Sequence, residues 1–388
     1  MKTFSALWAF ARPAGRRSAA AGFAVFVAAM LAGHAPAAIN TWSGASGENL
    51  STGTSSWTLV ATVGNPTEPT VGTYHVAPAA SAATTSYQDA LFTTTGTFLV
   101  SSASLRPRSV NITNGSTVEI QDTGANTLAF YISNAGTYTG TTSTASGSTS
   151  WTNQVSGGTN DAVYLSGSST LFFSAVNSTG AGVGTVQIRS SGAATTFNVL
   201  PGSTLRSDMV INGNQNGQPW PLTIKGGGLV IFGAQNAYTG LTTVESGTLR
   251  YATSNAIATG GVTVSGGILD LASYSDTVGA VTLTGGSIIG TGTLSGSSYA
   301  VSSGTITAVL SGTASLTKTG ASTATLTNAR FTGTTTVSAG ELALGAGSNL
   351  DSAAAISVAP GATLRILNPL THAVTGTGTI AVGPGGTL

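Results

Sequence analysis

The sequence of 388 residues contains no cysteine and little charge, because Asp, Glu, Lys and Arg together make up only 6% of it. The absence of cysteine excludes disulfides, Cys-ligated zinc, iron–sulfur clusters and thiol chemistry. Typical soluble domains are about 25% charged. Here 41% of the residues are hydrophobic, so the chain can bury a core and does not have the composition of a disordered protein.

The chain also lacks a long amphipathic helix pattern after its first 38 residues. Instead, short runs of Val, Ile, Leu and Thr stand between glycines, of which there are 53. Such runs favour β-strands, because β-branched residues fit a pleated surface and glycine forms the turns between strands. We therefore expect an all-β protein.

The first 37 residues have the pattern of an export signal. Four basic residues and no acidic residue precede an apolar segment at 18–31, and small residues follow at 35–37. A membrane anchor is the alternative, but this segment is shorter than the roughly 20 residues of a spanning helix. Arg16-Arg17 is similar to a twin-arginine signal, although no suitable apolar consensus follows it directly. We expect residues 1–37 to be a cleaved signal peptide.

Removal of this segment changes the charge of the protein. Four of the 13 basic residues lie in it, which leaves nine against 12 acidic residues and a net charge of about −3. Nucleic-acid-binding proteins need a clustered basic patch. The sequence therefore predicts no nucleic-acid partner.

A short template recurs through most of the chain: an apolar residue, two more residues, a glycine, one or two residues, and another apolar residue. Its glycines are Gly247, Gly267, Gly286, Gly304 and Gly340, and in a longer variant Gly115, Gly202, Gly361 and Gly385. From Gly247 the glycines lie 20, 19 and 18 residues apart, and the gap of 36 after Gly304 could hold two coils. Repetition at such a period usually decides the architecture.

A period near 20 residues fits one coil of a parallel β-solenoid. A strand of about five residues spans ~17 Å, and each coil buries its apolar face only by stacking on the next. We expect each glycine to supply a positive φ between two strands and Thr263, between Val262 and Val264, to face outward. An antiparallel β-sandwich is the alternative, but the nearly constant spacing favours stacked coils.

Two segments depart from this template. Residues 38–100 contain Trp42 and Trp57, and we expect an irregular N-terminal cap that covers the first open edge. Residues 134–160 are nearly all Ser, Thr, Gly and Asn, and we interpret them as a degenerate copy or an inserted loop. The expected organisation is a signal at 1–37, a cap at 38–100 and a β-helix over 101–388.

A longer phrase is repeated at 238–249 and 331–342. Each copy has an aromatic residue, Thr-Gly, a Thr-rich strand, a tight turn and a second strand. We expect the aromatic residues, Tyr238 and Phe331, to pack in the interior rather than to contact a ligand.

With their flanks, residues 222–251 and 316–344 resemble autotransporter-associated β-strand repeats. In the second copy the matching residues are Leu316, Thr317, Lys318, Gly320, Asn328, Phe331, Thr332, Gly333, Val337, Gly340 and Leu342. In the first copy they are Leu222, Thr223, Lys225, Asn236, Tyr238, Thr239, Gly240, Val244, Gly247 and Leu249, with one residue inserted before the aromatic. The segment from Trp42 to Trp57 is also similar to the start of many such exported bacterial proteins.

This resemblance implies a right-handed parallel β-helix that is carried as a passenger on a Gram-negative cell surface. Such passengers usually have a C-terminal outer-membrane β-barrel or a sorting tail. The sequence shows neither and stops inside a coil at 385–388. We therefore expect a truncated C-terminus, and a contact with the membrane only through a missing anchor or barrel.

Catalysis of the kind found in carbohydrate-active β-helix enzymes is the alternative function. Glycosidases use two carboxylates about 5 Å apart or somewhat more, and Asp270 and Asp276 are the nearest such pair on the expected helix. The two histidines after the signal, His75 and His372, are far apart in sequence. We predict no catalytic, cofactor-binding or metal-binding residues and no enzyme activity.

One ion pair is expected from the register of the template. Arg250 lies three residues after Gly247, and Asp270 lies three residues after Gly267. If these coils stack, the two side chains are neighbours on the outer face. Their attraction should contribute about 0.2–1 kcal/mol and weaken with salt.

Taken as a whole, the sequence favours a non-enzymatic passenger that is secreted or held on the cell surface, as an adhesin or a structural stalk. Ladders of Thr, Ser and Asn on a stiff column would bind glycans or other cell-surface components weakly and at many points. No aromatic binding platform is evident in the sequence. A purely mechanical spacer for a further domain is a third hypothesis.

Overall fold

The structure is a computed structural model, and part of the chain is described in it. The described residues are 39–42, 57–61, 89–92, 96–100, 110–112, 115–122, 129–132, 138–140, 149–151, 161–175, 185–188, 195–212, 219–257, 259–350, 355–370 and 373–388. The signal expected at 1–37, most of the segment 134–160, and both His75 and His372 lie outside these residues.

Two long sheets, here called sheets A and B, contain most of the described strands. Sheet A has 16 strands, which are β2 (Trp57–Ala61), β1 (Ile39–Trp42), β3 (Asp89–Phe92), β5 (Val110–Ile112), β10 (Asp161–Leu165), β13 (Thr195–Val199), β16 (Leu222–Lys225), β18 (Thr242–Val244), β20 (Val262–Val264), β22 (Asp276–Leu283), β24 (Thr293–Val301), β27 (Leu316–Lys318), β29 (Thr335–Val337), β31 (Ile356–Val358) and β33 (Val374–Gly376), with β26 (Val309–Ser311) beside β24. Sheet B has 13 strands, which are β4 (Gly96–Val100), β6 (Thr117–Asp122), β11 (Thr170–Ala175), β14 (Thr204–Ser207), β17 (Leu229–Phe232), β19 (Thr248–Tyr251), β21 (Ile268–Asp270), β23 (Ser287–Ile289), β25 (Gly304–Ile306), β28 (Thr323–Leu326), β30 (Glu341–Leu344), β32 (Thr363–Ile366) and β34 (Thr379–Val382).

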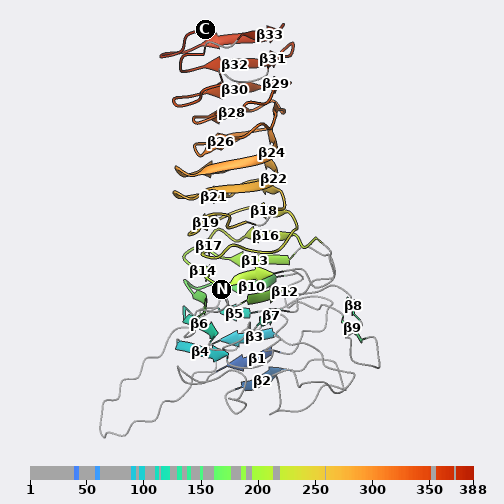
Figure 1. Ribbon diagram of the computed structural model, residues 1–388. Helices are drawn as coiled ribbons and strands as arrows, with labels where there is room; N and C mark the ends of the chain where they lie inside the picture. Colours follow the sequence, from blue (N-terminus) through green and yellow to red (C-terminus); the bar gives the residue numbers. More distant parts are fainter. Residues whose placement is uncertain are drawn as a thin grey trace, which may run out of the picture. The chain divides into compact units, whose positions relative to one another are not determined.

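Along the chain, a strand of sheet A is followed by a strand of sheet B, and each pairs in parallel with its counterpart in the next coil. Thus β18 pairs with β16 and β20, while β19 pairs with β17 and β21. Figure 1 shows these strands stacked one above another up to β33. The parallel β-solenoid is therefore confirmed, and the antiparallel sandwich is wrong. In the described chain, β1 pairs antiparallel with β2, and β8 (Tyr138–Gly140) forms an antiparallel hairpin with β9 (Thr149–Trp151).

The coils have a third side that the sequence did not predict. In the earlier coils it is a short sheet, here called sheet C, made of β7 (Ala129–Ile132), β12 (Thr185–Ile188) and β15 (Val210–Asn212). In later coils the long strands β22 and β24 extend onto this side, since Asp276 pairs with Leu294. The strand β26 continues that pairing through Leu310.

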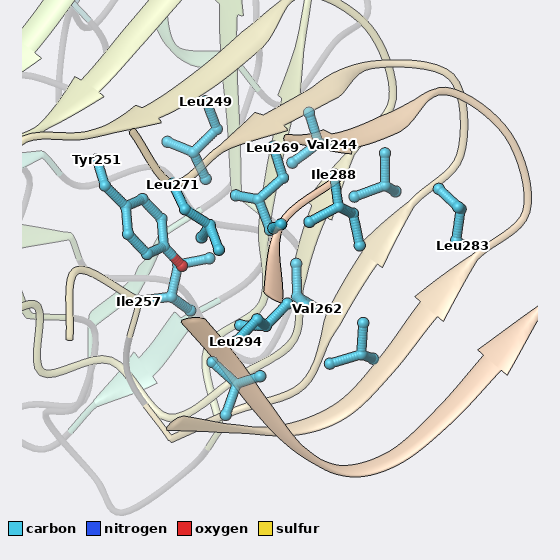
Figure 2. Packing of buried hydrophobic residues seen from close by; sticks show 14 of the residues in the cluster. Val244, Leu249, Tyr251, Ile257, Val262, Leu269, Leu271, Leu283, Ile288 and Leu294 are labelled. Carbon is cyan, nitrogen blue, oxygen red and sulfur yellow. The ribbon is translucent and has the colours of Figure 1, made fainter. Parts of the chain in front are cut away.

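Alternation along each short strand divides the coil into an inside and an outside. In β20 the side chains of Val262 and Val264 are buried, while Thr263 between them is half-buried on the outer face, as expected. Figure 2 shows side chains of successive coils meeting in one interior. Full burial of one Val or Leu side chain contributes roughly 1.5–3 kcal/mol. Stacking of coils thus supplies the core that no single coil has.

The template glycines other than Gly385 lie at the bend between a sheet A strand and a sheet B strand. Positive φ is found at Gly115, Gly202, Gly247, Gly286, Gly304, Gly340, Gly361 and Gly385, but not at Gly267. Gly247, at φ 77°, also lies so close to the previous coil that a Cβ atom would stand 2.5 Å from the oxygen of Gly228. At Gly267 the prediction of a positive φ was wrong. There a Cβ would meet a Val244 methyl at 2.6 Å, so closeness to the previous coil is what requires glycine.

Two further details of the expected period can be checked. The wide gap after Gly304 does hold an additional coil, formed by β27 and β28, with Gly320 at φ 73° between them. The last expected template was misplaced, because in the final coil the bend between β33 and β34 lies at 377–378. Gly385 follows β34 instead and ends a sheet B strand.

Within the segment 38–100 the strands join both long sheets. The strand β1 pairs in parallel with β3, and β2 lies on its other side as the antiparallel edge of sheet A. The strand β4 pairs in parallel with β6 in sheet B. The prediction that this segment caps the solenoid remains a prediction.

Candidate functional site

The two carboxylates considered for catalysis lie on either side of a turn but have separate partners. Asp270 ends β21, where one oxygen accepts a hydrogen bond from the Arg250 side chain at 2.7 Å and the other from the backbone of Ala272 at 2.8 Å. Asp276 begins β22, and its Oδ2 accepts a hydrogen bond from the Ile257 backbone at 3.0 Å. Asp270 is thus neutralised by a cation, whereas Asp276 is buried at 3% exposure. No pair of free carboxylates faces solvent here.

The expected ion pair between neighbouring coils is confirmed. Arg250 and Asp270 are directly opposite one another in the register of β19 and β21. Their side chains meet at 2.7 Å, with Arg250 half exposed and Asp270 nearly buried. Counting from the template glycines was therefore sufficient to predict a specific contact.

Metal binding was not expected, and no group of three or more His, Asp or Glu side chains in the described ranges is arranged to hold a metal ion. The two histidines considered above are not among those residues.

The outer face of sheet A carries small side chains over many successive coils. We define the hydroxyl face by the row of residues that starts at Thr263 in β20 and continues through its paired residue in each later coil up to β33, together with the residues two before and two after each of them. These residues are Gly261, Thr263, Ser265, Ala280, Thr282, Thr284, Ser298, Ala300, Ser302, Ser315, Thr317, Thr319, Thr334, Thr336, Ser338, Ala355, Ser357, Ala359, Ala373, Thr375 and Thr377, all half-buried or exposed. The face therefore has hydroxyl groups spaced by the strand separation of about 4.8 Å, without charge or aromatic rings.

Hydrogen bonds link neighbouring coils within this face. Thr334 donates to Ser315 at 2.8 Å, and Ser302 and Thr319 share a hydrogen bond of 3.1 Å. The hydroxyl face is thus partly satisfied by itself. Its methyl groups and the hydroxyl groups that remain free to form hydrogen bonds face the solvent.

The outer face of sheet B is different, because it carries charged and bulky residues. Besides Arg250 and Asp270, Glu341 accepts a hydrogen bond at 3.0 Å from Arg365 of the next coil. In an earlier coil, Arg206 donates hydrogen bonds of 2.9 to 3.1 Å to the carboxylate of Asp208. The Arg206 guanidinium also lies 5.6 Å from the centre of the Phe172 ring. The sequence analysis identified no aromatic residue on an outer face. Phe172 is such a residue, but the Arg206 side chain lies over its ring.

Asparagine side chains connect coils on the third side. Asn236 accepts a hydrogen bond from the Ile211 backbone at 2.8 Å and donates one to the Ala256 oxygen at 2.7 Å, so it bridges three coils. In the second repeat, Asn328 donates to the Thr307 oxygen at 2.7 Å. These residues were noted only as part of the repeated phrase. Their role is to satisfy backbone groups where the strands of sheets A and B have ended.

The lysines of the two repeats lie on opposite faces of sheet A, one toward the interior and one toward the outside. Lys318 is wholly buried, and its ammonium group donates to the oxygens of Thr319, Gly320 and Ala339 at 2.6, 2.8 and 3.0 Å. Desolvation lowers the pKa of Lys318 from its ordinary value. Lys225 points outward instead and forms an ion pair of 3.3 Å with Asp161.

A one-residue offset explains this difference. The strand β27 begins at Leu316, and Lys318 is its third residue, paired with Val301 and Val337 at an inward position. In the first repeat Ile224 takes that position, and Lys225 follows it. Because alternate side chains point to opposite faces, the extra residue moves the lysine outside.

The aromatic residues of the repeats are buried, as expected. Tyr238 packs edge-to-face on Trp220 at 5.4 Å, and Phe331 packs on Tyr299 at 5.4 Å. The Tyr238 hydroxyl shares a hydrogen bond of 2.8 Å with Thr242, and burial raises the pKa of Tyr238. Neither ring is available to a ligand.

The asparagines and lysines just described, with Tyr238 and Phe331, lie in two segments that match a known repeat family. Residues 222–250 and 316–344 match the family model of the passenger-associated-transport-repeat. The chain contains two such repeats. The resemblance to autotransporter passenger repeats is therefore confirmed, with nearly the same boundaries as the sequence indicated. Each match spans four strands, two of sheet A and two of sheet B, so that one repeat corresponds to two stacked coils.

No curated protein and no solved structure matches the chain. The repeats and the solenoid together fit an autotransporter passenger domain. Among the described residues, no helix is long and apolar enough to span a membrane.

Proposed function

We propose that the chain is the exported passenger of a bacterial surface protein and acts without catalysis, as a stalk whose outer face also adheres to glycans. The observation that carries the proposal is the coincidence of the two passenger repeats with contacts that hold coils together. In both repeats the asparagine and the lysine bind groups of other coils or turns. Side chains committed in this way build a column rather than a reaction centre.

The hydroxyl face is the surface we assign to adhesion. Its hydroxyl groups recur in register over successive coils, for instance at Thr317 and Thr336. Each hydroxyl contributes little, but a long glycan would engage many of them at once, so that avidity replaces affinity. The small expected net negative charge and the uncharged face favour neutral glycans over nucleic acid as partners.

Export is tested with the full chain carrying a C-terminal tag in a Gram-negative host. The proposal expects a product that begins near residue 38 and is found on the surface or in the medium, where added protease removes it from intact cells. An uncleaved product retained in the cytoplasm would contradict it.

Adhesion is tested on the same chain with paired substitutions. Thr317→Lys with Thr336→Lys changes the hydroxyl face, whereas Thr305→Lys with Thr325→Lys places the same charges on the outer face of sheet B, where these residues are also in register. Beads coated with the wild type should bind immobilised neutral polysaccharide. The first variant should lose at least tenfold in bound beads and the second should keep its binding.

Two results would refute this reading. Equal loss in both variants would show that the hydroxyl face is not the contact surface. Release of soluble sugar from the polysaccharide by the purified chain, at a rate that variants of Asp270 or Asp276 abolish, would establish the enzyme alternative.

A further inference from the structure

A ladder of side chains on the third side of the solenoid includes one member that can ionise. The Ile211 backbone donates to Asn236 of the next coil, and the Asn236 side chain donates to the Ala256 oxygen of the coil after that. Directly beside this oxygen, the Ile257 backbone donates to Oδ2 of Asp276 in the following coil at 3.0 Å. Like Asn236, Asp276 therefore accepts a hydrogen bond from a backbone N–H of the preceding coil.

Unlike Asn236, an ionised Asp276 side chain has no group that can donate a hydrogen bond. An asparagine has an oxygen acceptor and an N–H donor, whereas a carboxylate only accepts hydrogen bonds. The second oxygen of Asp276, Oδ1, is buried and has no hydrogen bond, and the same is true of the buried Tyr251 hydroxyl. Buried polar atoms without partners are rare, because each costs about 1–3 kcal/mol. A proton on the carboxyl group would supply the missing donor.

Among the residues that the structure describes, no positively charged group is found to interact with Asp276. The titratable groups that interact with it are Tyr251 from β19 and Tyr238 from the same preceding coils, and both are fully buried phenols. From the other packed elements, β24 presents Leu294 and the segment before β20 presents Ile257. Arg250 and Asp270 neutralise each other on the outer face of sheet B. Figure 2 shows Tyr251 among Leu249, Leu271 and Ile257 in the interior.

We propose that Asp276 is protonated in the folded solenoid and acts as a pH-sensitive joint between the coils that contain β19, β20 and β22. With its proton, the carboxyl group accepts from Ile257 and donates within the interior, as an asparagine would. Without it, a carboxylate with no counter-ion is buried near the phenols of Tyr251 and Tyr238. The joint then weakens and the proton is released to solvent as the coils open.

The electrostatics agree with this geometry. Burial raises the pKa of Asp276 above its ordinary value, and the backbone N–H of Ile257, the nearby Tyr251 hydroxyl and the backbone of Thr277 offset only part of that effect. Since the folded pKa is above the unfolded one, the stabilising contribution is fully present at pH below the unfolded pKa. It is lost as the pH rises through the interval up to the folded pKa.

The test measures chemical unfolding of the full chain as a function of pH for the wild type, Asp276→Asn and the control Asp270→Asn. Between the unfolded and the folded pKa of Asp276, the unfolding equilibrium constant of the wild type should rise by up to tenfold per pH unit, which is the limit for one proton. Asp276→Asn should remove this rise and exceed the wild type in stability at the alkaline end. Asp270→Asn should keep the rise, because its carboxylate is paired with Arg250 outside the interior.

An infrared measurement makes the test independent of whether a variant folds. The folded wild type should show the carbonyl stretch of a protonated carboxyl group at a pH where exposed Asp and Glu are ionised, and heating through unfolding should abolish it. Absence of that band, or a rise of the unfolding constant that is identical in Asp276→Asn and the wild type, would overturn the proposal.

Discussion

The two passenger repeats occupy the same kind of position in the solenoid, yet one has a hydroxyl group that the other lacks. In the first, Tyr238 bonds to Thr242 four residues later. In the second, the corresponding residues are Phe331 and Thr335, and the buried Thr335 hydroxyl has no partner. The two threonines lie opposite Leu222 and Leu316, which open the repeats.

The lysines differ in the complementary sense. The first repeat keeps its lysine outside in an ion pair, and the second buries it against three backbone oxygens. A repeat can thus tolerate exchange of polar contacts between positions as long as each coil remains bonded to the next. The comparison teaches that the phrase specifies stacking geometry, while the satisfaction of individual polar groups varies from copy to copy.

The largest difference between the repeats is expected at the lysines. Lys318→Ala removes the buried stem and leaves three oxygens without their donor, which should cost about 2–4 kcal/mol of unfolding free energy. Lys225→Ala removes a partly exposed ion pair and should cost less than about 1 kcal/mol. Denaturant unfolding of both variants measures the contrast. Equal losses would show that the inward position of Lys318 has no energetic consequence.

An intermediate effect is expected when the hydroxyl is removed from the first repeat. Tyr238→Phe leaves Thr242 buried without its partner and should cost about 1–2 kcal/mol. Packing against Trp220 should be retained, since the ring stays in place. The near-ultraviolet circular dichroism of the variant checks this, and an unchanged unfolding midpoint would contradict the role given to the hydroxyl.

The reverse exchange in the second repeat should stabilise the protein. Phe331→Tyr supplies a hydroxyl group to Thr335 and should add about 0.5–1.5 kcal/mol. The same denaturant experiment reads the result. A loss of stability would mean that the interior near Tyr299 has no space for the added oxygen and that the two repeats are not equivalent there.

The smallest effects are expected at the ion pairs that link each repeat to the coil after it. A double-mutant cycle on Arg250 and Asp270 should give about 0.2–1 kcal/mol, because the residues are directly opposite. The diagonal pair of Glu341 and Arg365 should give less, since Glu341 is opposite Thr363. Both coupling energies should fall at high salt. A larger coupling for the diagonal pair would contradict the register.

The architecture was open to prediction because its causes are local. Recurring glycines set the period, and strand alternation set the inside and outside, so that even the contact of Arg250 with Asp270 could be named in advance. The inward direction of Lys318 also follows from alternation after Leu316, but a charged residue was not expected to be inside. The strands on the third side were missed because their residues carry no glycine template.

Other features depend on contacts between distant parts of the chain. The burial of Asp276 results from coils that fold over it, and nothing in its immediate sequence indicates that one oxygen lacks a partner. The same holds for the free hydroxyl of Thr335. At Gly267 the spacing was right and the physical reason was wrong, since crowding by Val244 is visible only in three dimensions.

The central claim, that the repeats are stacked coil on coil in this register, can be tested directly by cross-linking, since the natural chain contains no cysteine. Cysteines at Thr317 and Thr336, which are paired across β27 and β29, should form a disulfide on mild oxidation of the folded protein, because neighbouring strands lie within the Cα range that a disulfide spans. Cysteines at Thr317 and Ser357, two coils apart, should stay reduced. Failure of the first pair to cross-link, or equally rapid cross-linking of the second, would contradict the account.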